Sequence, residues 1–189
     1  TSETLKADTS IPERIHQFSQ QFESENYPFK FISNGIFGYI AHDAVAHFEN
    51  LELNQEKEGL DIPEIYYAVY QNIIAISLFN HEAHLFSHVY NEQHNIETIE
   101  QLLEAKNSTR FSFEKVGAKT SNLTDEEYLG FVDQGKQHCF RGDVFQLVLS
   151  RRFSQKFKGD EFNVYRTLRS INPSPYLFFF DYGDFKIFG

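Results

Sequence analysis

The chain has 189 residues, with 17 Lys and Arg against 27 Asp and Glu, a net charge of −10, and 41% hydrophobic residues. These values exclude a disordered chain and indicate a soluble globular one that is long enough to bury a core without disulfides. The acidic balance argues against nucleic acid, which needs clustered Lys and Arg, and no apolar run approaches the ~20 residues that span a membrane.

The counts of the two sulfur-containing residues bear on the origin of the chain. Cys139 is the only cysteine, so no internal disulfide is possible and the cytoplasm is the expected compartment. We expect Cys139 to be half-buried on a helix rather than a nucleophile. There is no methionine, so we expect that Thr1 is not the natural first residue and that the chain is a piece of a longer protein.

The N-terminal region is predicted to begin with a helix. Ser10 and Glu13 have the spacing of a capping box, and Ile15, Phe18 and Phe22 then fall on one helical face. Over residues 29–46, glycines set among large apolar side chains predict a strand, a turn and close backbone packing.

Runs of β-branched and aromatic residues predict consecutive antiparallel strands over 66–70, 73–79 and 85–90, with a polar turn at 80–82. Three histidines, His81, His84 and His88, lie around this turn. Ligands four residues apart suit one face of a helix, whereas a strand would scatter them. We therefore expect exposed polar positions on a hairpin and no metal site in this chain.

The middle of the chain is predicted to be helical and then polar. Asn95 precedes a short amphipathic helix over 96–103, which polar connections at 106–109 and 114–123 follow. Thr124 and Glu127 form a second capping box, for a helix that ends at Gly142.

The C-terminal region is predicted to contain most of the sheet. The largely apolar run Asp143–Ser150 is typical of a strand covered on both faces. The basic residues that follow indicate a strand with a solvated face; they are Arg151, Arg152, Lys156 and Lys158. Asp160 is predicted to cap a helix, and 176–180 with 185–188 form a hairpin.

Strands paired in sequence between helices favour an α+β fold over a doubly wound sheet. The second hairpin strand runs into Gly189 and leaves its edge uncovered. We therefore expect residues 1–189 to form a single incomplete domain.

Two long strings are more specific than any generic motif. GDVFQLVLSR at 142–151 and SINPSPYLFFFDYGDFKIFG at 170–189 resemble the chorismate-utilising enzymes, most closely anthranilate synthase component I. GIFGYIAHDAV at 35–45 and DIPEI at 61–65 are also similar, so the resemblance covers most of residues 29–189. It implies an α/β sandwich with a mostly antiparallel sheet and flanking helices, of which this chain is an N-terminal part without the extreme N-terminal segment.

The resemblance also implies a reaction. Such enzymes add ammonia from a glutamine amidotransferase partner to chorismate and release anthranilate and pyruvate, in tryptophan biosynthesis. They use Mg²⁺, which requires hard oxygen ligands. The family's ligands and catalytic histidine lie beyond Gly189, so the resemblance implies no metal ligand in this chain and no activity of the chain alone.

Gln146 matches a functional position of the family. Relatives that add water to chorismate carry a Lys base there, and a neutral amide cannot deprotonate water but suits an ammonia nucleophile. The alternative is a polar group of a core strand with a local partner.

Asn172, Pro173, Ser174, Pro175 and Tyr176 resemble the segment that lines the family's inhibitory tryptophan site. The two prolines fix φ, and the neighbouring carbonyls can accept from an ammonium group. The alternative is an ordinary turn between a helix and a strand. The opposite wall, an N-terminal Leu-Leu-Glu-Ser type of string, is absent from this sequence, and Leu177 stands where Met is common.

Two other functions fit the same strings. Aminodeoxychorismate synthase component I resembles the chain over the same segments, although Ser174 favours anthranilate synthase. A non-catalytic amino-acid-binding regulatory domain is the alternative from another class.

Overall fold

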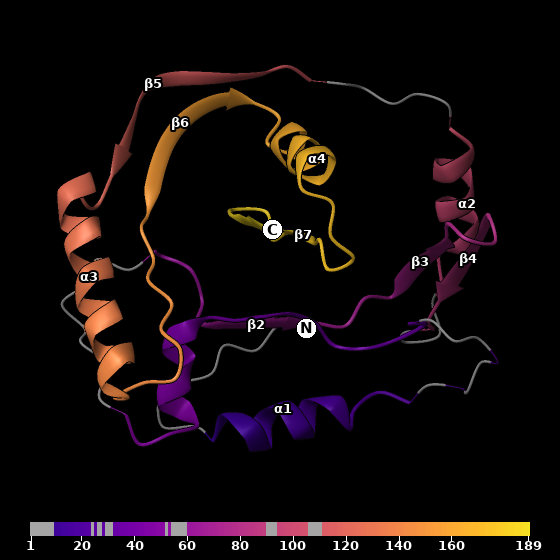
Figure 1. The fold of residues 1–189 in the computed structure, drawn as a ribbon. Helices are drawn as coiled ribbons and strands as arrows, with labels where there is room; N and C mark the ends of the chain where they lie inside the picture. Colours follow the sequence, from indigo (N-terminus) through magenta and orange to yellow (C-terminus); the bar gives the residue numbers. More distant parts are fainter. Residues whose placement is uncertain are drawn as a thin grey trace. The chain divides into compact units, whose positions relative to one another are not determined.

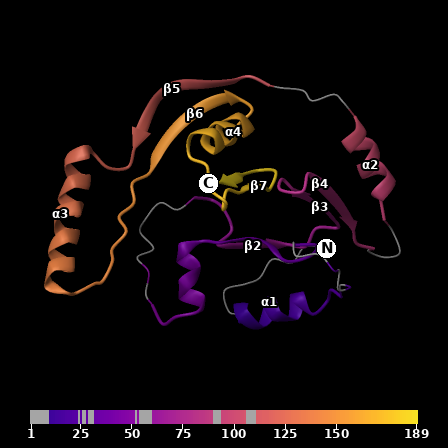
Figure 2. The same cartoon turned by 45° about the vertical axis from the view of Figure 1, so that its right-hand side comes forward.

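The computed structural model describes residues 10–23, 25, 28, 32–51, 53, 60–89, 94–105 and 111–189. The chain forms two compact units, Thr1–Asn107 and Ser108–Gly189, and Figures 1 and 2 show the elements of each. The predicted connection at 106–109 lies outside the described residues, as do residues 29–31 of the predicted strand and turn.

The first unit contains two antiparallel strand pairs with short helices. Its elements are α1 (Ile11–Ser19), β1 (Phe37–Ile40), the 3₁₀ helix η1 (His42–His47), β2 (Ile65–Ala68), β3 (Asn72–Ser77), β4 (Glu82–Ser87) and α2 (Ile96–Glu104). β1 pairs with β2 and β3 pairs with β4. The helices predicted after Ser10 and Asn95 are thus confirmed.

The start of α1 differs from its predicted capping box. Ser10 is the N-cap residue, but its side chain makes no capping hydrogen bond. Pro12 lies two positions later and has no N–H, so one of the two donors that a capping hydroxyl can use is missing. The predicted helical face is only partly formed, because α1 ends at Ser19, before Phe22. The rings of Phe18 and Phe22 nevertheless meet edge to face at 5.1 Å.

Close backbone packing is confirmed where β1 meets β2. Gly38 pairs with Tyr67, and a Cβ atom at position 38 would collide with the carbonyl oxygen of Tyr66. Tyr39 beside it donates to the carbonyl oxygen of Pro63 at 2.6 Å. Burial and the neighbouring Tyr66 raise the pKa of Tyr39.

β3 and β4 form the predicted hairpin, and His81 at its turn has a φ of 57°. The prediction that the preceding strand would pair with them is wrong, because β2 pairs with β1 instead. His84 and His88 are half-buried rather than exposed, and Nε2 of His88 lies 2.9 Å from the carbonyl oxygen of Ser33. Among the residues that the structure describes, no three His, Cys, Asp or Glu side chains could hold a metal ion.

The second unit contains two more antiparallel pairs. Its elements are β5 (Phe113–Ser121), α3 (Asp125–Arg141), β6 (Phe153–Gly159), α4 (Phe162–Ile171), β7 (Phe179–Asp181) and β8 (Lys186–Phe188). β5 pairs with β6 and β7 pairs with β8. The strand, helix and hairpin predicted over residues 153–188 are therefore confirmed.

The polar connection predicted at 114–123 is wrong, because most of it belongs to β5. Glu114 pairs with Lys158, and the rings of Phe113 and Phe157 stack at 5.3 Å. A two-stranded ribbon can keep polar side chains on both faces, so the apolar alternation that identifies a strand is missing from the sequence.

Both predicted ends of α3 are confirmed. The backbone N–H of Thr124 donates to the Glu127 carboxylate at 2.8 Å, and the Glu127 N–H donates to the Thr124 hydroxyl at 3.2 Å. Gly142 ends the helix with a φ of 78°. Cys139 is exposed, so the prediction of a half-buried cysteine is wrong; it lines an open hollow together with Leu147 and Leu149.

The hairpin β7–β8 packs on α4 through aromatic rings. The ring of Phe179 meets Phe162 edge to face at 4.9 Å and stacks on Phe188 at 5.6 Å. The side chain of Asp160 accepts from the Phe162 N–H at 3.0 Å, as predicted for the start of this helix.

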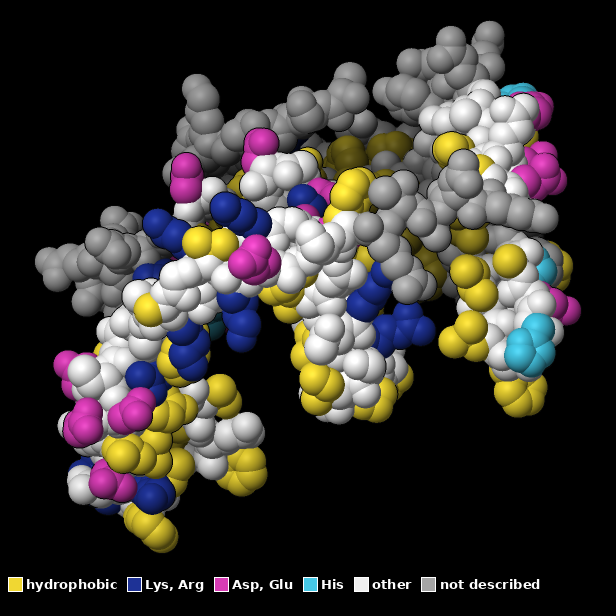
Figure 3. Space-filling view, turned by 90° about the horizontal axis from the view of Figure 1, so that it is seen from above, with side chains coloured by type: hydrophobic (Ala, Val, Ile, Leu, Met, Phe, Trp, Pro, Cys, Tyr) yellow, Lys and Arg dark blue, Asp and Glu magenta, His cyan; other side chains and the backbone are white. Residues whose placement is uncertain are grey.

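Much apolar surface stays exposed within each unit. The buried hydrophobic side chains among the described residues are Ile11, Ala44 and Phe86, and Figure 3 shows many hydrophobic side chains on the surface. Helices with antiparallel pairs confirm the α+β class, and the single incomplete domain stays a prediction. In the described part of the chain, no helix is long and apolar enough to cross a membrane.

Candidate functional site

Gln146 lies on the segment between α3 and β6. The predicted strand over Asp143–Ser150 is wrong, since these residues are in neither a helix nor a strand. The reason is that the partner strand β5 is too short to reach these residues. β5 pairs with β6 as far as Ser121 and Phe153, the Asn122 N–H still donates to the Arg152 carbonyl at 3.2 Å, and the chain then turns into α3.

The backbone of this segment is unpaired. Within the described residues, Val144–Ser150 make no hydrogen bond through backbone or side chain. Gln146 is also exposed to solvent, so its amide can bind a ligand without first losing a hydrogen bond to the described residues. Its predicted catalytic role stays a prediction.

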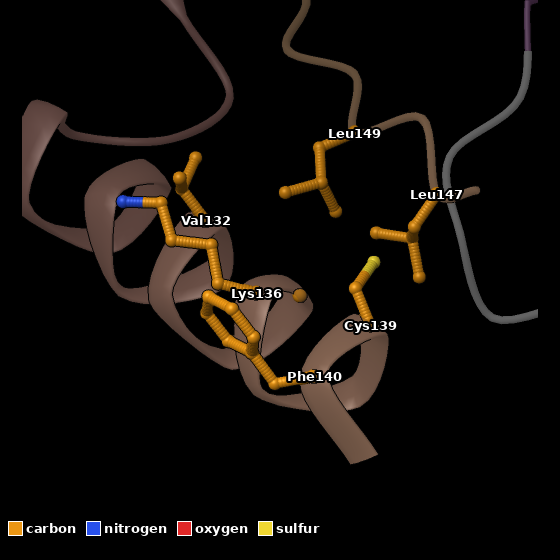
Figure 4. A pocket seen from close by; sticks show the side chains of 7 residues that line it. Val132, Lys136, Cys139, Phe140, Leu147 and Leu149 are labelled. Carbon is orange, nitrogen blue, oxygen red and sulfur yellow. The ribbon is translucent and has the colours of Figure 1, made fainter. Parts of the chain in front are cut away.

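One side of the segment packs on α3. A Cβ atom at Gly135 would lie 3.2 Å from Cδ2 of Leu147 and 3.6 Å from Cδ1 of Leu149, so the glycine allows a close approach. These leucines and α3 side chains, among them Val132 and Cys139, border a hollow of about 260 Å³ (Figure 4). Among the residues that line this hollow, Lys136 carries the charged side chain and most of the others are apolar.

The upstream end of the segment is held by charges at the end of α3. Nδ1 of His138 lies 2.8 Å from Oδ2 of Asp143, and Arg141 donates to the same oxygen through Nε at 3.0 Å and Nη2 at 2.8 Å. These bonds, from Arg141 first and then from His138, lower the pKa of Asp143.

The downstream end is held by Arg151. Its guanidinium donates to the Ser121 hydroxyl at 2.8 Å, the Leu123 carbonyl at 2.7 Å and the Asp125 carboxylate at 2.6 Å. It also lies 4.7 Å from the centre of the Phe153 ring. Its side chain is only 17% exposed, so the predicted solvated face is wrong for this residue.

The second predicted site, Asn172–Tyr176, is an exposed connection between α4 and β7. The Asn172 N–H donates to the Leu168 carbonyl at 2.9 Å, and the Tyr176 N–H donates to the Ser174 hydroxyl at 3.2 Å. The Tyr176 side chain is 86% exposed. The structure therefore presents these five residues as an exposed connection that ends in a turn at Pro175 and Tyr176, and their role in inhibitor binding stays a prediction.

An ion pair holds the elements on both sides of this turn. Nζ of Lys186 on β8 lies 2.8 Å from Oε1 of Glu161 at the start of α4 and 3.5 Å from Oδ1 of Asp181 on β7. The hydrogen bond from Lys186 lowers the pKa of Glu161, and the same bond raises the pKa of Lys186. In the described part of the chain, no hydrogen bond joins Gln146 to the turn.

Sequence reasoning missed the groups that hold these segments, namely Asp143, Arg151 and Lys186. For Arg151 a signal exists. Consecutive side chains of an extended chain point to opposite sides, so Arg151 and Arg152 cannot both face solvent on the same side. For Lys186 the partner on α4 is too distant in sequence to be read from periodicity.

Comparison with known proteins assigns this sequence to a family. The family model described as chorismate binding enzyme matches residues 2–189. Anthranilate synthase component 1 of Acetivibrio thermocellus is 28% identical over 188 residues, which are 89% of this chain and 38% of the relative. The corresponding protein of Aquifex aeolicus is 30% identical, over 82% of the chain and 34% of the relative.

A relative with another name matches equally well. Aminodeoxychorismate synthase component 1 of Bacillus subtilis is 29% identical over 183 residues, which cover 92% of this chain and 39% of the relative. The chain thus spans less than two fifths of the length of these curated relatives.

A solved structure supports the fold. The crystal structure of anthranilate synthase component I from Streptococcus pneumoniae matches with a TM-score of 0.65 at 24% identity, over 89% of this chain and 40% of that one. This likeness confirms the predicted fold.

Proposed function

Since the chain belongs to the chorismate-binding enzyme family, we propose that it is part of an anthranilate synthase component I. The complete enzyme converts chorismate and ammonia to anthranilate and pyruvate, in the cytoplasm, for tryptophan biosynthesis. The named relatives from Acetivibrio and Aquifex support this choice. The observation that carries it is the neutral side chain of Gln146, which makes no hydrogen bond within the described residues.

The chemistry of an amide distinguishes the two nucleophiles. Water must lose a proton to attack effectively, and a glutamine side chain cannot accept that proton near neutral pH. Ammonia is nucleophilic without deprotonation, so the amide oxygen of Gln146 needs only to accept a hydrogen bond and orient it. The exposed amide makes no hydrogen bond in the described residues that a ligand would have to break.

The proposed partners follow from the same reaction. A glutamine amidotransferase subunit supplies ammonia, and tryptophan inhibits by binding at Asn172–Tyr176. Mg²⁺, when bound, holds the substrate carboxylate and stabilises developing negative charge. Among the described residues no three His, Cys, Asp or Glu side chains are grouped so that they could hold an ion. We therefore place no ligand of the ion in this chain and route no step of this proposal through it.

The test uses an enzyme of the length of the relatives, with chorismate, Mg²⁺ and ammonium. It should release anthranilate, measured by fluorescence, whereas the 189-residue chain alone should release none. Gln146→Lys should lower amination and yield some product of water addition. Gln134→Lys, the same change on the exposed surface of α3, should leave turnover unchanged. Unchanged amination by Gln146→Lys would remove Gln146 from the active site.

The product separates this proposal from its alternatives. The relative from Bacillus subtilis supports aminodeoxychorismate synthesis as the alternative reaction. Aminodeoxychorismate retains the enolpyruvyl side chain of chorismate. Amination without pyruvate release would therefore establish the alternative enzyme. A protein of full length that binds tryptophan but does not consume chorismate would be the regulatory domain.

A further inference from the structure

We propose that Asn34 is a site of spontaneous covalent modification, at which the side-chain amide is lost as ammonia and aspartate or isoaspartate is formed. The reaction requires only water. Asn34 lies in the loop before β1, distant in sequence from Gln146 and from the turn at 172–176. The inference therefore goes beyond the proposed function and does not depend on it.

The sequence places a glycine directly after Asn34. No other asparagine of the chain precedes a glycine. Asparagine is a thermolabile residue, because its side-chain carbonyl carbon can be attacked by the peptide nitrogen of the next residue. Glycine has no Cβ atom, so this nitrogen is unshielded and the backbone can adopt the conformation that closes a ring. Asn34 is thus the asparagine of this chain with the smallest steric barrier to ring closure.

The structure holds the two reacting groups together. The backbone N–H of Gly35 donates to Oδ1 of Asn34 at 2.8 Å. Since Oδ1 is bonded to Cγ, this hydrogen bond keeps the side chain folded over the nitrogen that attacks Cγ. Holding reacting groups close in this way accelerates an intramolecular reaction. Both residues are half-buried rather than buried, so water reaches them.

No competing contact holds the amide away from the backbone. Within the described residues, the Asn34 side chain makes no other hydrogen bond. By contrast, Oδ1 of Asn122 accepts from the Arg152 N–H at 2.9 Å, and Nδ2 of Asn163 donates to the Phe111 carbonyl at 2.7 Å. These two side chains must break a hydrogen bond before they can turn toward the next peptide nitrogen. The fold therefore permits ring closure at Asn34 and opposes it at Asn122 and Asn163.

The reaction balances with water as its co-reactant. A base from solvent removes the Gly35 N–H proton, the nitrogen bonds to Cγ of Asn34, and the bond from Cγ to Nδ2 breaks. The leaving nitrogen takes up a proton and departs as ammonia, which leaves a cyclic succinimide. Water then opens the ring. Attack at Cγ gives aspartate, whereas attack at the backbone carbonyl gives isoaspartate, and neither step is an oxidation or a reduction.

The isoaspartate product lengthens the main chain between two fixed points. Upstream, Nε2 of His88 lies 2.9 Å from the carbonyl oxygen of Ser33. Downstream, β1 pairs with β2 from Phe37 onward. The additional main-chain carbon has to be accommodated between these points or by the end of β1. The amides of β1 should therefore exchange faster with solvent in the isoaspartate form than in the unmodified chain.

Peptide mapping by mass spectrometry tests the site after the 189-residue chain is incubated in mildly alkaline buffer. The peptide that contains Asn34 should show conversion of an amide to a carboxyl group, and an isoaspartate-specific methyltransferase should label it. The rate should equal or exceed that of a synthetic peptide with the sequence of residues 32–37, because the fold holds the reacting groups together. Reaction in the folded chain that is several-fold slower than in the peptide would overturn the proposal. Equal conversion of Asn34 and Asn122 would also overturn it.

Gly35→Ala tests the route through the backbone nitrogen. A Cβ atom at position 35 would lie 3.8 Å from the Phe37 ring, an ordinary contact, and Gly35 is not in the left-handed region. The variant should therefore keep its thermal midpoint, and its conversion at Asn34 should be several-fold slower. An unchanged rate would exclude ring closure by this nitrogen. Unchanged exchange of the β1 amides in the isoaspartate form would refute the effect on the strand.

Discussion

Replacing Arg151 with methionine removes a set of contacts that joins three parts of the second unit while keeping the side-chain length. The guanidinium bonds to the end of β5 through Ser121, to the Leu123 carbonyl, and to Asp125 in the first turn of α3. It also lies over the Phe153 ring. The substitution therefore loosens the start of α3 and the end of the Gln146 segment together.

The magnitude follows from the exposure of each partner. The bonds to Ser121 and Leu123 contribute about 1 kcal/mol each. Asp125 is 79% exposed, so that ion pair contributes only about 0.5 kcal/mol. The ring contact adds about 0.5 kcal/mol. The expected loss is about 3 kcal/mol, or a thermal midpoint lower by roughly 12 to 24 °C for a unit of this size.

Urea and thermal unfolding followed by circular dichroism measure this loss. Lys156→Met is the control, because it removes one positive charge from the exposed surface of β6, where Lys156 forms no ion pair within the described residues. The control should change the free energy of unfolding by less than about 0.5 kcal/mol. If Arg151→Met and Lys156→Met shift the midpoint equally, the contacts of Arg151 do not stabilise the unit.

Three further predictions follow. Lys186 lowers the pKa of Glu161 below its ordinary value of 4.5, so their ion pair stabilises the fold above that pH, and this stability is lost as the pH falls through the lowered pKa. When the urea midpoint is measured from about pH 7 to about pH 3, Lys186→Met should therefore reduce the loss of stability on the acid side. An unchanged pH dependence would show that the pair contributes nothing. Gly38→Ala should lower the free energy of unfolding by about 1–3 kcal/mol, because the new methyl group meets the Tyr66 carbonyl. The amides of β1 should then exchange faster with solvent. Unchanged exchange would mean that the two strands tolerate a Cβ atom at this position. In the proposed full enzyme, Pro175→Ala should weaken tryptophan inhibition several-fold, or ~1 kcal/mol, with uninhibited turnover near normal; an unmoved inhibition curve would make the segment an ordinary turn.

The elements predicted correctly are those with local signals. Thr124, Glu127 and Gly142 bound α3 as predicted, because caps involve residues within one turn of the helix. The hairpin strands β3 and β4 were predictable from β-branched runs around a polar turn. The predictions for Cys139 and Ser10 were wrong because side-chain burial and capping depend on what lies around them.

Strand pairing was the weakest part of the prediction. β5 was missed because its side chains are largely polar, and a strand was expected at Asp143–Ser150 because its side chains are apolar. In the structure β5 pairs and Asp143–Ser150 does not. Composition describes how a strand would be covered, whereas pairing requires a partner of matching length, which is a property of the rest of the chain.

The sequence by itself determined the α+β class, the ends of α3 and the family, because caps and long ordered strings such as GDVFQLVLSR are local features. It also singled out Gln146 and Asn172–Tyr176 as candidate sites. Only the tertiary structure decided what holds these segments in place. Arg151 reaches back 26 to 30 residues to Asp125, Leu123 and Ser121, and Lys186 reaches Glu161 on another element. Such contacts depend on how β5, β6 and the helices meet in space, and no periodicity within a short window of sequence encodes that distance.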